Sequence, residues 1–365
     1  MKKLVVELGE RSYPIYIRSG GLQHISDYLR QHRLEDDLYI ITDSTVHQLY
    51  ADAIARALEK GGHRFYFISV KPGELSKSLA TAGQIYTRLI ESGATRKSII
   101  VALGGGVVGD LAGFIAATFL RGIRFVQIPT TVLAQVDSSV GGKVGINHPL
   151  GKNLIGAFYQ PEFVLIDPYV LKTLPLREIK AGFAEIIKYG FIRDESLFSL
   201  LQEKHQSFLS LHDYDLIEKV IHTCCHIKAA VVSQDEKESG LRAILNFGHT
   251  AGHALESVTH YKVFLHGEAV LHGIRAALYL SRVLAYLSPD EEARGQQFIT
   301  ALAPPAIPRT VTTTALLSAM QHDKKRTREG QLWVLLKRIG QSFLSRDVDE
   351  EAVEQALDYM LKAGQ

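Results

Sequence analysis

The feature that most constrains the fold of this chain is a regular alternation of strand-like and helix-like segments in its first half. Apolar, β-rich runs at 38–42, 64–70 and 98–103 predict buried strands, and amphipathic patterns at 44–60 and 76–92 predict helices. Strands that alternate with helices of this length form parallel sheets whose faces are covered by the helices. Because ligands of such sheets bind beyond the carboxyl ends of the strands, we expect functional groups at that edge.

The pattern changes near residue 174, where helical periodicity takes over. The helices expected beyond this point cover 178–189, 194–203, 216–232, 249–260, 268–285 and 350–363. We therefore predict an α/β, Rossmann-like parallel-sheet domain at 1–174. A mostly α-helical domain at 175–365 follows it.

The composition argues against several other classes of protein. The formal net charge is +2 and no basic block stands out, which gives no support to nucleic-acid binding. No run reaches the roughly 18 apolar residues of a membrane span, and the start of the chain lacks an apolar signal core. The only cysteines, Cys224 and Cys225, are neighbours and rarely bridge in that arrangement, so a reducing compartment fits. We expect a cytoplasmic enzyme that binds neither nucleic acid nor membrane.

A glycine turn follows the strand at 98–103. Residues 104–109 fit G-x-G-x-x-G and precede a helical run at 111–120, whose first N–H groups suit a pyrophosphate. The usual acidic companion about 20 residues later is absent from 124–128. The turn by itself therefore leaves a purely structural turn and a dinucleotide site both open.

Polar groups at other strand ends support a ligand edge. Asp43 ends one strand, Glu74 lies in a turn after another, and Thr130 and Thr131 follow a third. The carboxylates suit ribose hydroxyls, although helix capping is the alternative for Asp43 and Ser76.

A glycine-rich polar segment at 135–147 leads to a second one at 151–156. Glycines flank Lys143 and Lys152, as expected for backbone shaped around an anion. The alternative is a flexible surface loop.

Histidine spacing points to a metal. His249 and His253 are four residues apart on one face of a predicted helix, and His266 opens another helix. The metalloprotease motif H-E-x-x-H is absent, because Thr250 follows His249. Glu185 and Lys188 share a helix face, which by default indicates an ion pair. His205, His212, His222 and His226 lack such context and are interpreted as surface or packing residues.

Five of these segments, in order along the chain, resemble the 3-dehydroquinate synthase family. They are 104–114, 129–147, 151–161, 182–190 and 245–256, within a match that runs from Asp43 to about Lys325. The resemblance implies a homodimer in which NAD lies across the cleft between the two domains. It implies these cofactor contacts: Asp43, Glu74, Lys77, Gly105, Gly106, Val107, Asp110, Thr130, Thr131, Lys143, Lys152 and Thr173. Thr45 departs from the family, which often has Asn there.

The resemblance also assigns the metal and the substrate groups. The ligands of zinc, or cobalt, would be Glu185, His249 and His266, and His253 moves to the substrate phosphate and a proton relay. The other phosphate contacts implied are Asn153, Asn246, one of Lys324 and Lys325, and Arg121 from a partner subunit. The carboxylate would be held by Lys228 and Arg242, and the ring hydroxyls by Asp137 and Lys188; Lys143 counts with the catalytic as well as the cofactor residues.

The reaction implied by the resemblance converts 3-deoxy-D-arabino-heptulosonate 7-phosphate into 3-dehydroquinate and phosphate. Transient oxidation by NAD, phosphate elimination, re-reduction and an intramolecular aldol closure make it redox-neutral overall. Another sugar-phosphate cyclase, a metal-dependent polyol dehydrogenase of the same superfamily and a non-catalytic binding protein remain the alternatives. His272, Arg275 and Ala251 depart from the family pattern beside the metal helix, with packing or subunit contacts as the expected effect.

Overall fold

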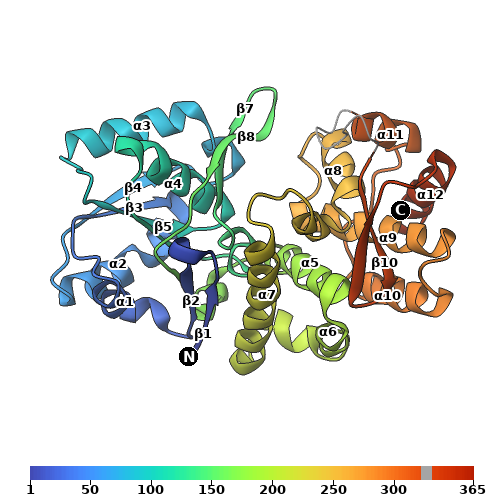
Figure 1. Cartoon of the computed structure of the whole chain (residues 1–365), viewed down its shortest axis with the longest axis horizontal. Coiled ribbons are helices and arrows are strands. Elements are labelled where there is room, and N and C mark those ends of the chain that lie inside the picture. Colours follow the sequence, from blue (N-terminus) through green and yellow to red (C-terminus); the bar gives the residue numbers. More distant parts are fainter. Residues whose placement is uncertain (322–330) are drawn as a thin grey trace. The chain divides into compact units, whose positions relative to one another are not determined.

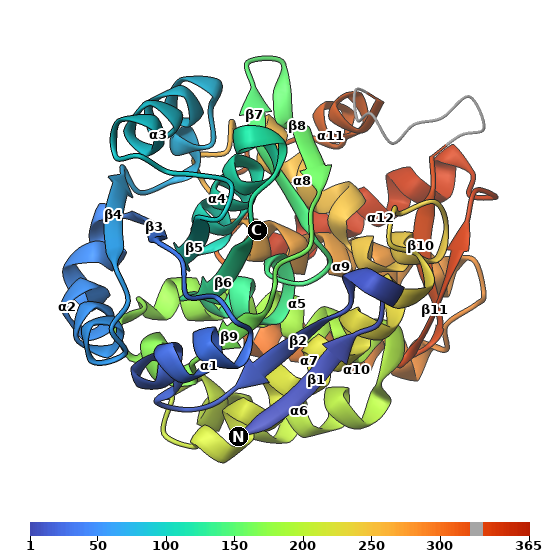
Figure 2. The ribbon, with the colours of Figure 1, turned by 60° about the vertical axis from the view of Figure 1, so that its left-hand side comes forward.

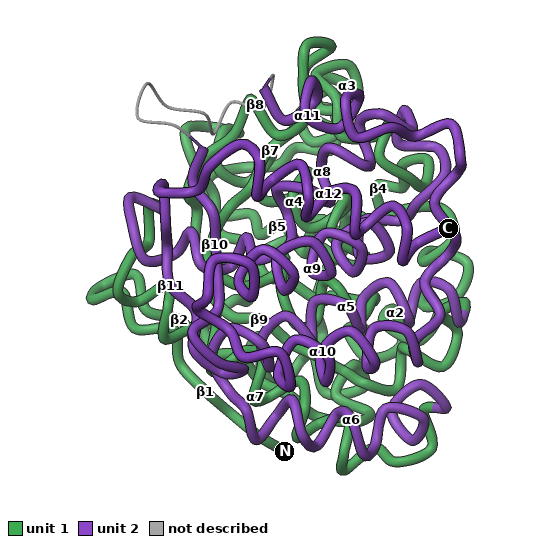
Figure 3. Tube along the Cα trace, turned by 90° about the vertical axis from the view of Figure 1, so that its right-hand side faces the viewer, with its two compact units in different colours: residues 1–175, 211–237 green, residues 176–210, 238–365 purple. Residues whose placement is uncertain are grey.

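The structure, a computed structural model, describes residues 1–321 and 331–365. The chain divides into two compact units (Figure 3). The first contains Met1–Pro175 and Leu211–Lys237, and the second contains Leu176–Ser210 and Glu238–Gln365. This division differs from the predicted 1–174 and 175–365 in one segment. Helix α7 (Tyr214–Gln234) belongs to the first unit, because it packs on β1 (Lys2–Val6) of that unit.

A seven-stranded sheet forms the centre of the first unit (Figures 1 and 2). Its order is β1-β2-β9-β6-β5-β3-β4, and all neighbours except β1 and β2 pair in parallel. The other strands are β2 (Tyr13–Ile17), β3 (Leu38–Asp43), β4 (Phe65–Val70), β5 (Ile99–Gly104), β6 (Phe125–Pro129) and β9 (Val164–Ile166). The predicted Rossmann-like parallel sheet is confirmed.

Helices cover both faces of this sheet, which is why its central strands are apolar on both sides. Ile41 and Ala102 pack in a cluster that includes Leu111 of α4 (Gly106–Thr118). Ile40 and Val101, one residue earlier on the same strands, pack in a second cluster on the opposite face. The helices of this unit, besides α7, are α1 (Ile25–Gln31), α2 (Ser44–Lys60), α3 (Leu79–Glu91) and α4 (Gly106–Thr118).

The glycine-rich segments form an ordered hairpin. β7 (Lys143–His148) pairs antiparallel with β8 (Gly151–Phe158), so a flexible loop is the wrong interpretation for this part. Gly156 is needed because a Cβ there would lie 2.3 Å from the carbonyl oxygen of Val144. The residues just before the hairpin, Ala134–Ser138, form a π-helical turn.

The second unit is mostly helical, as predicted. Its helices are α5 (Leu176–Arg193), α6 (Glu195–Leu209), α8 (His249–Val258), α9 (His266–Val283), α10 (Pro289–Ala301), α11 (Thr313–Gln321) and α12 (Glu350–Gly364). One hairpin, β10 (Trp333–Arg338) with β11 (Gln341–Ser345), was not expected from the sequence. Among the described residues, no helix combines the length and apolar character needed to cross a bilayer.

Glycines let the backbones of α5, α8 and α9 approach one another closely. A Cβ at Gly267, in the first turn of α9, would lie 1.8 Å from the carbonyl oxygen of Ala181 on α5. A Cβ at Gly273 would lie 1.9 Å from the carbonyl oxygen of Gly248 at the start of α8. Since the obstructing atoms are backbone, these spacings cannot relax by side-chain rotation. Three helices that carry predicted metal residues are thereby held at close quarters.

Candidate functional site

The predicted site residues divide between the two units. The first unit carries all the predicted cofactor residues together with Arg121, Asp137, Asn153 and Lys228. The second carries Glu185, Lys188, Arg242, Asn246, His249, His253 and His266. Lys324 and Lys325 lie outside the described residues.

The glycine turn of the first unit leads into α4 as an uncapped helix N-terminus. Gly105 is the N-cap residue and its position has no side-chain cap, so the first N–H groups of α4 remain for a ligand. A Cβ at Gly105 would lie 3.0 Å from Cγ2 of Thr131, and a Cβ at Gly106 would lie 3.0 Å from Oγ of Ser138. The turn is therefore a narrow cradle that fits a group such as a pyrophosphate only when glycines form it.

The strand order places this cradle at a switch point of the sheet. β3 and β5 are neighbours, and the chain leaves β3 toward β4 on one side but leaves β5 toward β6 on the other. Ligands bind at such points because the flanking loops part there. Asp43 at the end of β3 accepts hydrogen bonds from the N–H groups of Thr45 and Val46 through Oδ1, which confirms its role as a helix cap. Ser76 instead donates to the carbonyl of Lys71.

Lys77 is buried in a polar network rather than exposed to a ligand. Its Nζ lies 2.7 Å from Oδ2 of Asp110 and 2.5 Å from Oδ1 of Asn153. Asn147 extends the network, because its amide donates to Glu74 over 2.7 Å and its Oδ1 accepts from the N–H of Asn153. Burial raises the pKa of Asp110, and the charge of Lys77 opposes that rise. The network ties the hairpin to α4 and to the turn after β4.

A second buried lysine meets the other predicted acidic group of this unit. Lys228 of α7 forms an ion pair with the carboxylate of Asp137 and also donates to the Asp137 carbonyl over 2.6 Å. Asp137 belongs to the π-helical turn that follows β6. The two residues, 91 positions apart, are thus brought together at one point.

The remaining predicted residues of the first unit are mostly at its surface. Thr130 is buried at the end of β6, and its N–H donates to the carbonyl of Gly104 over 2.9 Å. Thr173 shares a hydrogen bond with Tyr50, 2.5 Å apart. Arg121 is exposed and has a left-handed backbone, with φ of 69°. Val107, Lys143 and Lys152 lie in α4, β7 and β8, and both lysines are exposed.

In the second unit, a buried carboxylate faces two imidazoles. Oε1 of Glu185 lies 3.7 Å from Nε2 of His249 and 3.6 Å from Nε2 of His266. This oxygen is fully buried and has no hydrogen-bond partner, whereas Oε2 forms an ion pair with Lys188. A buried acceptor without a partner is costly unless something fills the gap. A cation between these three atoms would satisfy it.

The other ring nitrogens of these two histidines are already engaged. Nδ1 of His249 lies 3.1 Å from the carbonyl oxygen of Phe247, and Nδ1 of His266 lies 3.2 Å from Oε2 of Glu256. Because both partners are acceptors, each Nδ1 carries the hydrogen and each Nε2 presents its lone pair. The two Nε2 atoms are the ones that face Glu185, which is the arrangement that a divalent metal requires.

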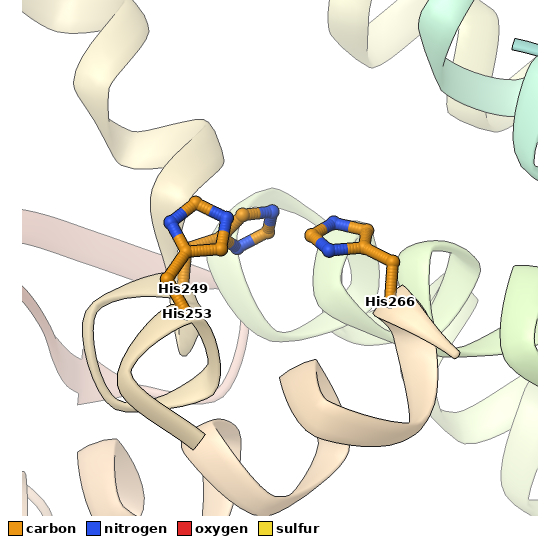
Figure 4. Close-up of side chains that lie close together, drawn as sticks. All are labelled: His249, His253 and His266. Atoms are coloured by element: carbon orange, nitrogen blue, oxygen red, sulfur yellow. The ribbon is translucent and has the colours of Figure 1, made fainter. Parts of the chain in front are cut away.

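His253 lies beside this group (Figure 4). It projects from α8 one turn after His249, and ligand atoms of His249, His253 and His266 lie within 4.8 Å of one another. The structure therefore brings together all four predicted residues, Glu185 included. Geometry alone permits His253 as a ligand in place of Glu185, as the spacing first indicated.

The pKa values of His249 and His266 are shifted in opposite directions. Burial, aided by the positive charge of Lys188, holds the pKa of His249 well below its usual range. Burial also acts to lower the pKa of His266, but the hydrogen bond and charge of Glu256, with the charge of Glu185, raise it overall. Burial therefore favours the neutral ring of His249, whereas the two carboxylates favour positive charge at or beside His266.

Arg242 and Asn246 lie on one 3-10 turn, Leu241–Asn246, directly before α8. Arg242 is among the largest fully buried side chains of the protein, and Asn246 donates to Glu238 over 3.1 Å. The carboxylate and phosphate contacts that these residues are predicted to make are therefore close in the chain to the histidine cluster.

The departures beside the metal helix are packing residues within the second unit. His272 is buried, and its Nε2 lies 2.8 Å from the carbonyl oxygen of Pro305. Arg275 is buried and donates to Thr300 of α10 over 3.0 Å. Ala251 is buried in the cluster that α8 and α9 share.

Two features of this cluster went unnoticed in the sequence. Glu256, the partner of His266, lies seven residues after His249 and so on the same helix face, a spacing that offered a signal. The N–H of Leu265 is capped by Glu268, which also forms a two-point ion pair with Arg177 over 2.7 and 2.8 Å. The ion pair of Arg177 and Glu268 joins the start of α9 to the start of α5, and no local sequence pattern indicates it.

Two solved structures similar to this chain are those of sugar-phosphate cyclases with NAD+ and a metal ion bound. A 2-deoxy-scyllo-inosose synthase in complex with carbaglucose-6-phosphate, NAD+ and Co2+ is 26% identical, with a TM-score of 0.89, over 98% of this chain and 99% of that one. A 2-epi-5-epi-valiolone synthase from Streptomyces hygroscopicus with NAD+ and Zn2+ is also 26% identical, with a TM-score of 0.89, over 98% of both chains. A glycerol dehydrogenase from Schizosaccharomyces pombe shares the fold alone, at 15% identity over 96% of this chain and 89% of that one, with a TM-score of 0.67.

Sequence comparison narrows the class further. Residues 67–181 match the 3-dehydroquinate synthase N-terminal profile, and residues 182–326 match the C-terminal one. A 3-dehydroquinate synthase of Desulforamulus reducens is 47% identical over 96% of this chain and 98% of its own. One of Pelobacter propionicus is 48% identical over 89% of this chain and 90% of its own. The chain belongs to the 3-dehydroquinate synthase family, and the resemblance found in its motifs is confirmed.

Proposed function

We propose that this protein is a 3-dehydroquinate synthase of the shikimate pathway. It converts 3-deoxy-D-arabino-heptulosonate 7-phosphate into 3-dehydroquinate and phosphate, with NAD and zinc or cobalt as cofactors. The observation that carries the proposal is the convergence of Glu185, His249 and His266, in a chain 47% identical to a synthase of that name. The two solved cyclases named above, which make other products, are 26% identical.

The proposed metal ligands are Oε1 of Glu185 and the Nε2 atoms of His249 and His266. The unpartnered Oε1 and the fixed hydrogens on both Nδ1 atoms support this choice. Lys188 supports it further, because it occupies Oε2 and leaves Glu185 one oxygen to offer. When bound, the metal would supply Lewis-acid activation of a substrate hydroxyl, and NAD would supply a reversible hydride acceptor.

The first unit is proposed to hold the dinucleotide. The uncapped N-terminus of α4 and its glycine cradle suit the pyrophosphate, and the carboxylates of Asp43 and Glu74 suit ribose hydroxyls. Gly105, Gly106, Val107, Asp110, Thr130, Thr131, Lys143, Lys152 and Thr173 are proposed to complete this site. Lys77 is proposed to support this site indirectly, through its hydrogen bonds to Asp110 and Asn153.

The remaining polar groups are proposed to bind and orient the substrate. His253, Asn246 and Asn153 are proposed to bind the phosphate, and His253 to accept or donate a proton at an imidazole nitrogen. The carboxylate is assigned to Lys228 and Arg242, whose guanidinium suits a two-point clamp. Asp137 and Lys188 are assigned to ring hydroxyls; Lys324 and Lys325, and Arg121 of a partner subunit, are further candidates for the phosphate. Orientation of this kind is the larger part of the catalysis that these residues provide.

The rival functions differ in what they release. A polyol dehydrogenase would accumulate NADH and release no phosphate, and a cyclase for a neutral sugar phosphate would not need a carboxylate clamp. The test is phosphate release from the metal-loaded protein with NAD and either the heptulosonate phosphate or glucose 6-phosphate. Release from the heptulosonate alone supports the synthase, whereas release from glucose 6-phosphate alone contradicts it.

The proposal includes a cytoplasmic homodimer. Leu154 and Phe158 are exposed on one face of β8, whose outer edge has no partner strand among the described residues. An open edge with apolar side chains suits pairing with a second copy. The two cysteines are buried and form no disulfide among the described residues, which fits a reducing compartment. Light scattering on the purified protein tests the dimer, and a monomer mass at all concentrations contradicts it.

A further inference from the structure

We propose that Glu256 is the positioning residue of the metal site, because it fixes the tautomer and the orientation of His266. This inference rests on the proposed metal ligands and deepens them. Glu256 is 5% exposed, and its Oε2 lies 3.2 Å from Nδ1 of His266. No other carboxylate is recorded within hydrogen-bonding distance of that ring in the described part of the chain.

The contact decides which nitrogen of His266 can bind a metal. An ionised carboxylate only accepts hydrogen bonds, so Nδ1 must carry the hydrogen. The lone pair is then on Nε2, which is the atom 3.6 Å from Oε1 of Glu185. Without Glu256, the neutral ring would interchange its tautomers and rotate, and only part of the population would present Nε2.

The end of α8 is built to hold Glu256 in place. The backbone carbonyl of Glu256 accepts a hydrogen bond from the N–H of Tyr261 over 2.8 Å and one from Oγ1 of Thr259 over 3.2 Å. His260 and Tyr261 both have left-handed backbones, with φ of 55° and 56°, which turn the chain back toward α9. The segment between the helices therefore brings His266 to the side chain of Glu256.

The two imidazole ligands are controlled differently. His249 donates to a neutral backbone carbonyl, that of Phe247, and no side-chain substitution removes that acceptor. His266 depends on a side chain that is charged. A carboxylate partner also makes the imidazole a stronger donor to the metal than a carbonyl does. Substitution of Glu256 can thus change the electronic character of this ligand pair without changing a ligand.

The test compares Glu256→Leu and Glu256→Gln with the wild-type full chain. Zinc affinity is measured on the metal-stripped protein by competition with a chromogenic chelator. The tautomer of His266 is read from ¹⁵N–¹H NMR correlations of the imidazole. We expect the leucine variant to bind zinc about 10- to 100-fold more weakly. The glutamine variant should lose less, because its amide oxygen still accepts from Nδ1.

A matched control comes from Glu292, another buried carboxylate of the second unit, which pairs with Arg282 over 2.5 Å. Glu292→Gln should leave zinc affinity unchanged. Zinc affinity of Glu256→Leu within twofold of wild type, or an unchanged His266 tautomer in that variant, overturns the inference. If the leucine variant does not fold, the same two readouts on Glu256→Ala, which also removes the acceptor, decide it. Failure of the wild type to make dehydroquinate while it binds zinc would contradict the proposed function and leave this inference standing.

Discussion

At the scale of single residues, two neighbouring histidines are assigned different tasks. His249 has its Nδ1 engaged and its Nε2 directed toward Glu185, whereas His253 is the proposed phosphate contact and proton relay. His249→Ala should therefore abolish zinc binding. His253→Ala should retain zinc and lower kcat by about 10²- to 10⁴-fold, as expected for a lost proton-transfer group. Zinc analysis of both variants, beside turnover, checks this; loss of zinc in His253→Ala would show that the ligand assignment is wrong.

A second residue-scale prediction concerns stability. Burial lowers the pKa of His272 to about 4, with Arg275 contributing in the same direction. The unfolded chain takes up this proton near pH 6.5, whereas the folded protein resists it. The stabilisation is therefore complete above pH 6.5 and is lost as the pH falls toward 4.

Between pH 7 and pH 5 the loss should be about 2 kcal/mol. The side-chain amide in His272→Gln can still donate to Pro305 but does not titrate, so the variant should show a correspondingly smaller difference in unfolding free energy. Denaturant unfolding at the two pH values measures both. An equal pH dependence in the variant would rule out His272 as its source.

At the scale of elements, the metal site depends on how closely α5 and α9 approach. Gly267→Ala would place a Cβ 1.8 Å from the carbonyl oxygen of Ala181, so the two helices must separate. We expect a loss of about 1–3 kcal/mol in stability, together with weaker zinc binding, because Glu185 and His266 lie on these helices.

The matched control is Gly83→Ala in α3, where a Cβ would meet nothing within 4 Å. It should stabilise the protein by about 0.5–1 kcal/mol and leave zinc affinity unchanged. Thermal unfolding and chelator competition on both variants provide the comparison. Wild-type zinc affinity in Gly267→Ala would contradict the role given to this contact.

The Lys77 network makes a separate prediction about the hairpin of β7 and β8. Lys77→Met removes the cation between Asp110 and Asn153, so the hairpin loses its anchor and the pKa of Asp110 rises further. We expect faster amide hydrogen exchange at 147–158. We also expect NAD to bind about tenfold more weakly or worse, because one charged hydrogen bond is lost. The exposed Lys71→Met is the control. Unchanged exchange in the hairpin would mean that Lys77 does not hold it.

At the scale of the whole molecule, local patterns predicted the sheet better than the site. Both faces of β3 and β5 are covered, so their runs are continuously apolar and easily recognised. The hairpin of β7 and β8 was not predicted, because its glycines, needed for backbone contact, are also typical of loops. The placement of α7 in the first unit depends on packing against β1, more than 200 residues away in the chain, for which helical periodicity gives no signal.

Histidine spacing shows the same limit for the site. His222 and His226 have the same four-residue spacing as His249 and His253, and their rings lie parallel, 6.4 Å apart. What distinguishes the second pair is a carboxylate from another helix, Glu185, which spacing along one helix cannot reveal. The family motifs indicate Glu185 as a ligand, and the structure gives its distances to His249 and His266.

The most direct test of the account is the ratio of phosphate to NADH in a single incubation. The zinc-loaded protein, a catalytic amount of NAD and excess heptulosonate phosphate are mixed, and phosphate, dehydroquinate and NADH are followed together. A redox-neutral synthase must release phosphate and dehydroquinate in equal amounts, many times in excess of NAD, with no net NADH. NADH formed in proportion to substrate consumed, without phosphate, would contradict the account.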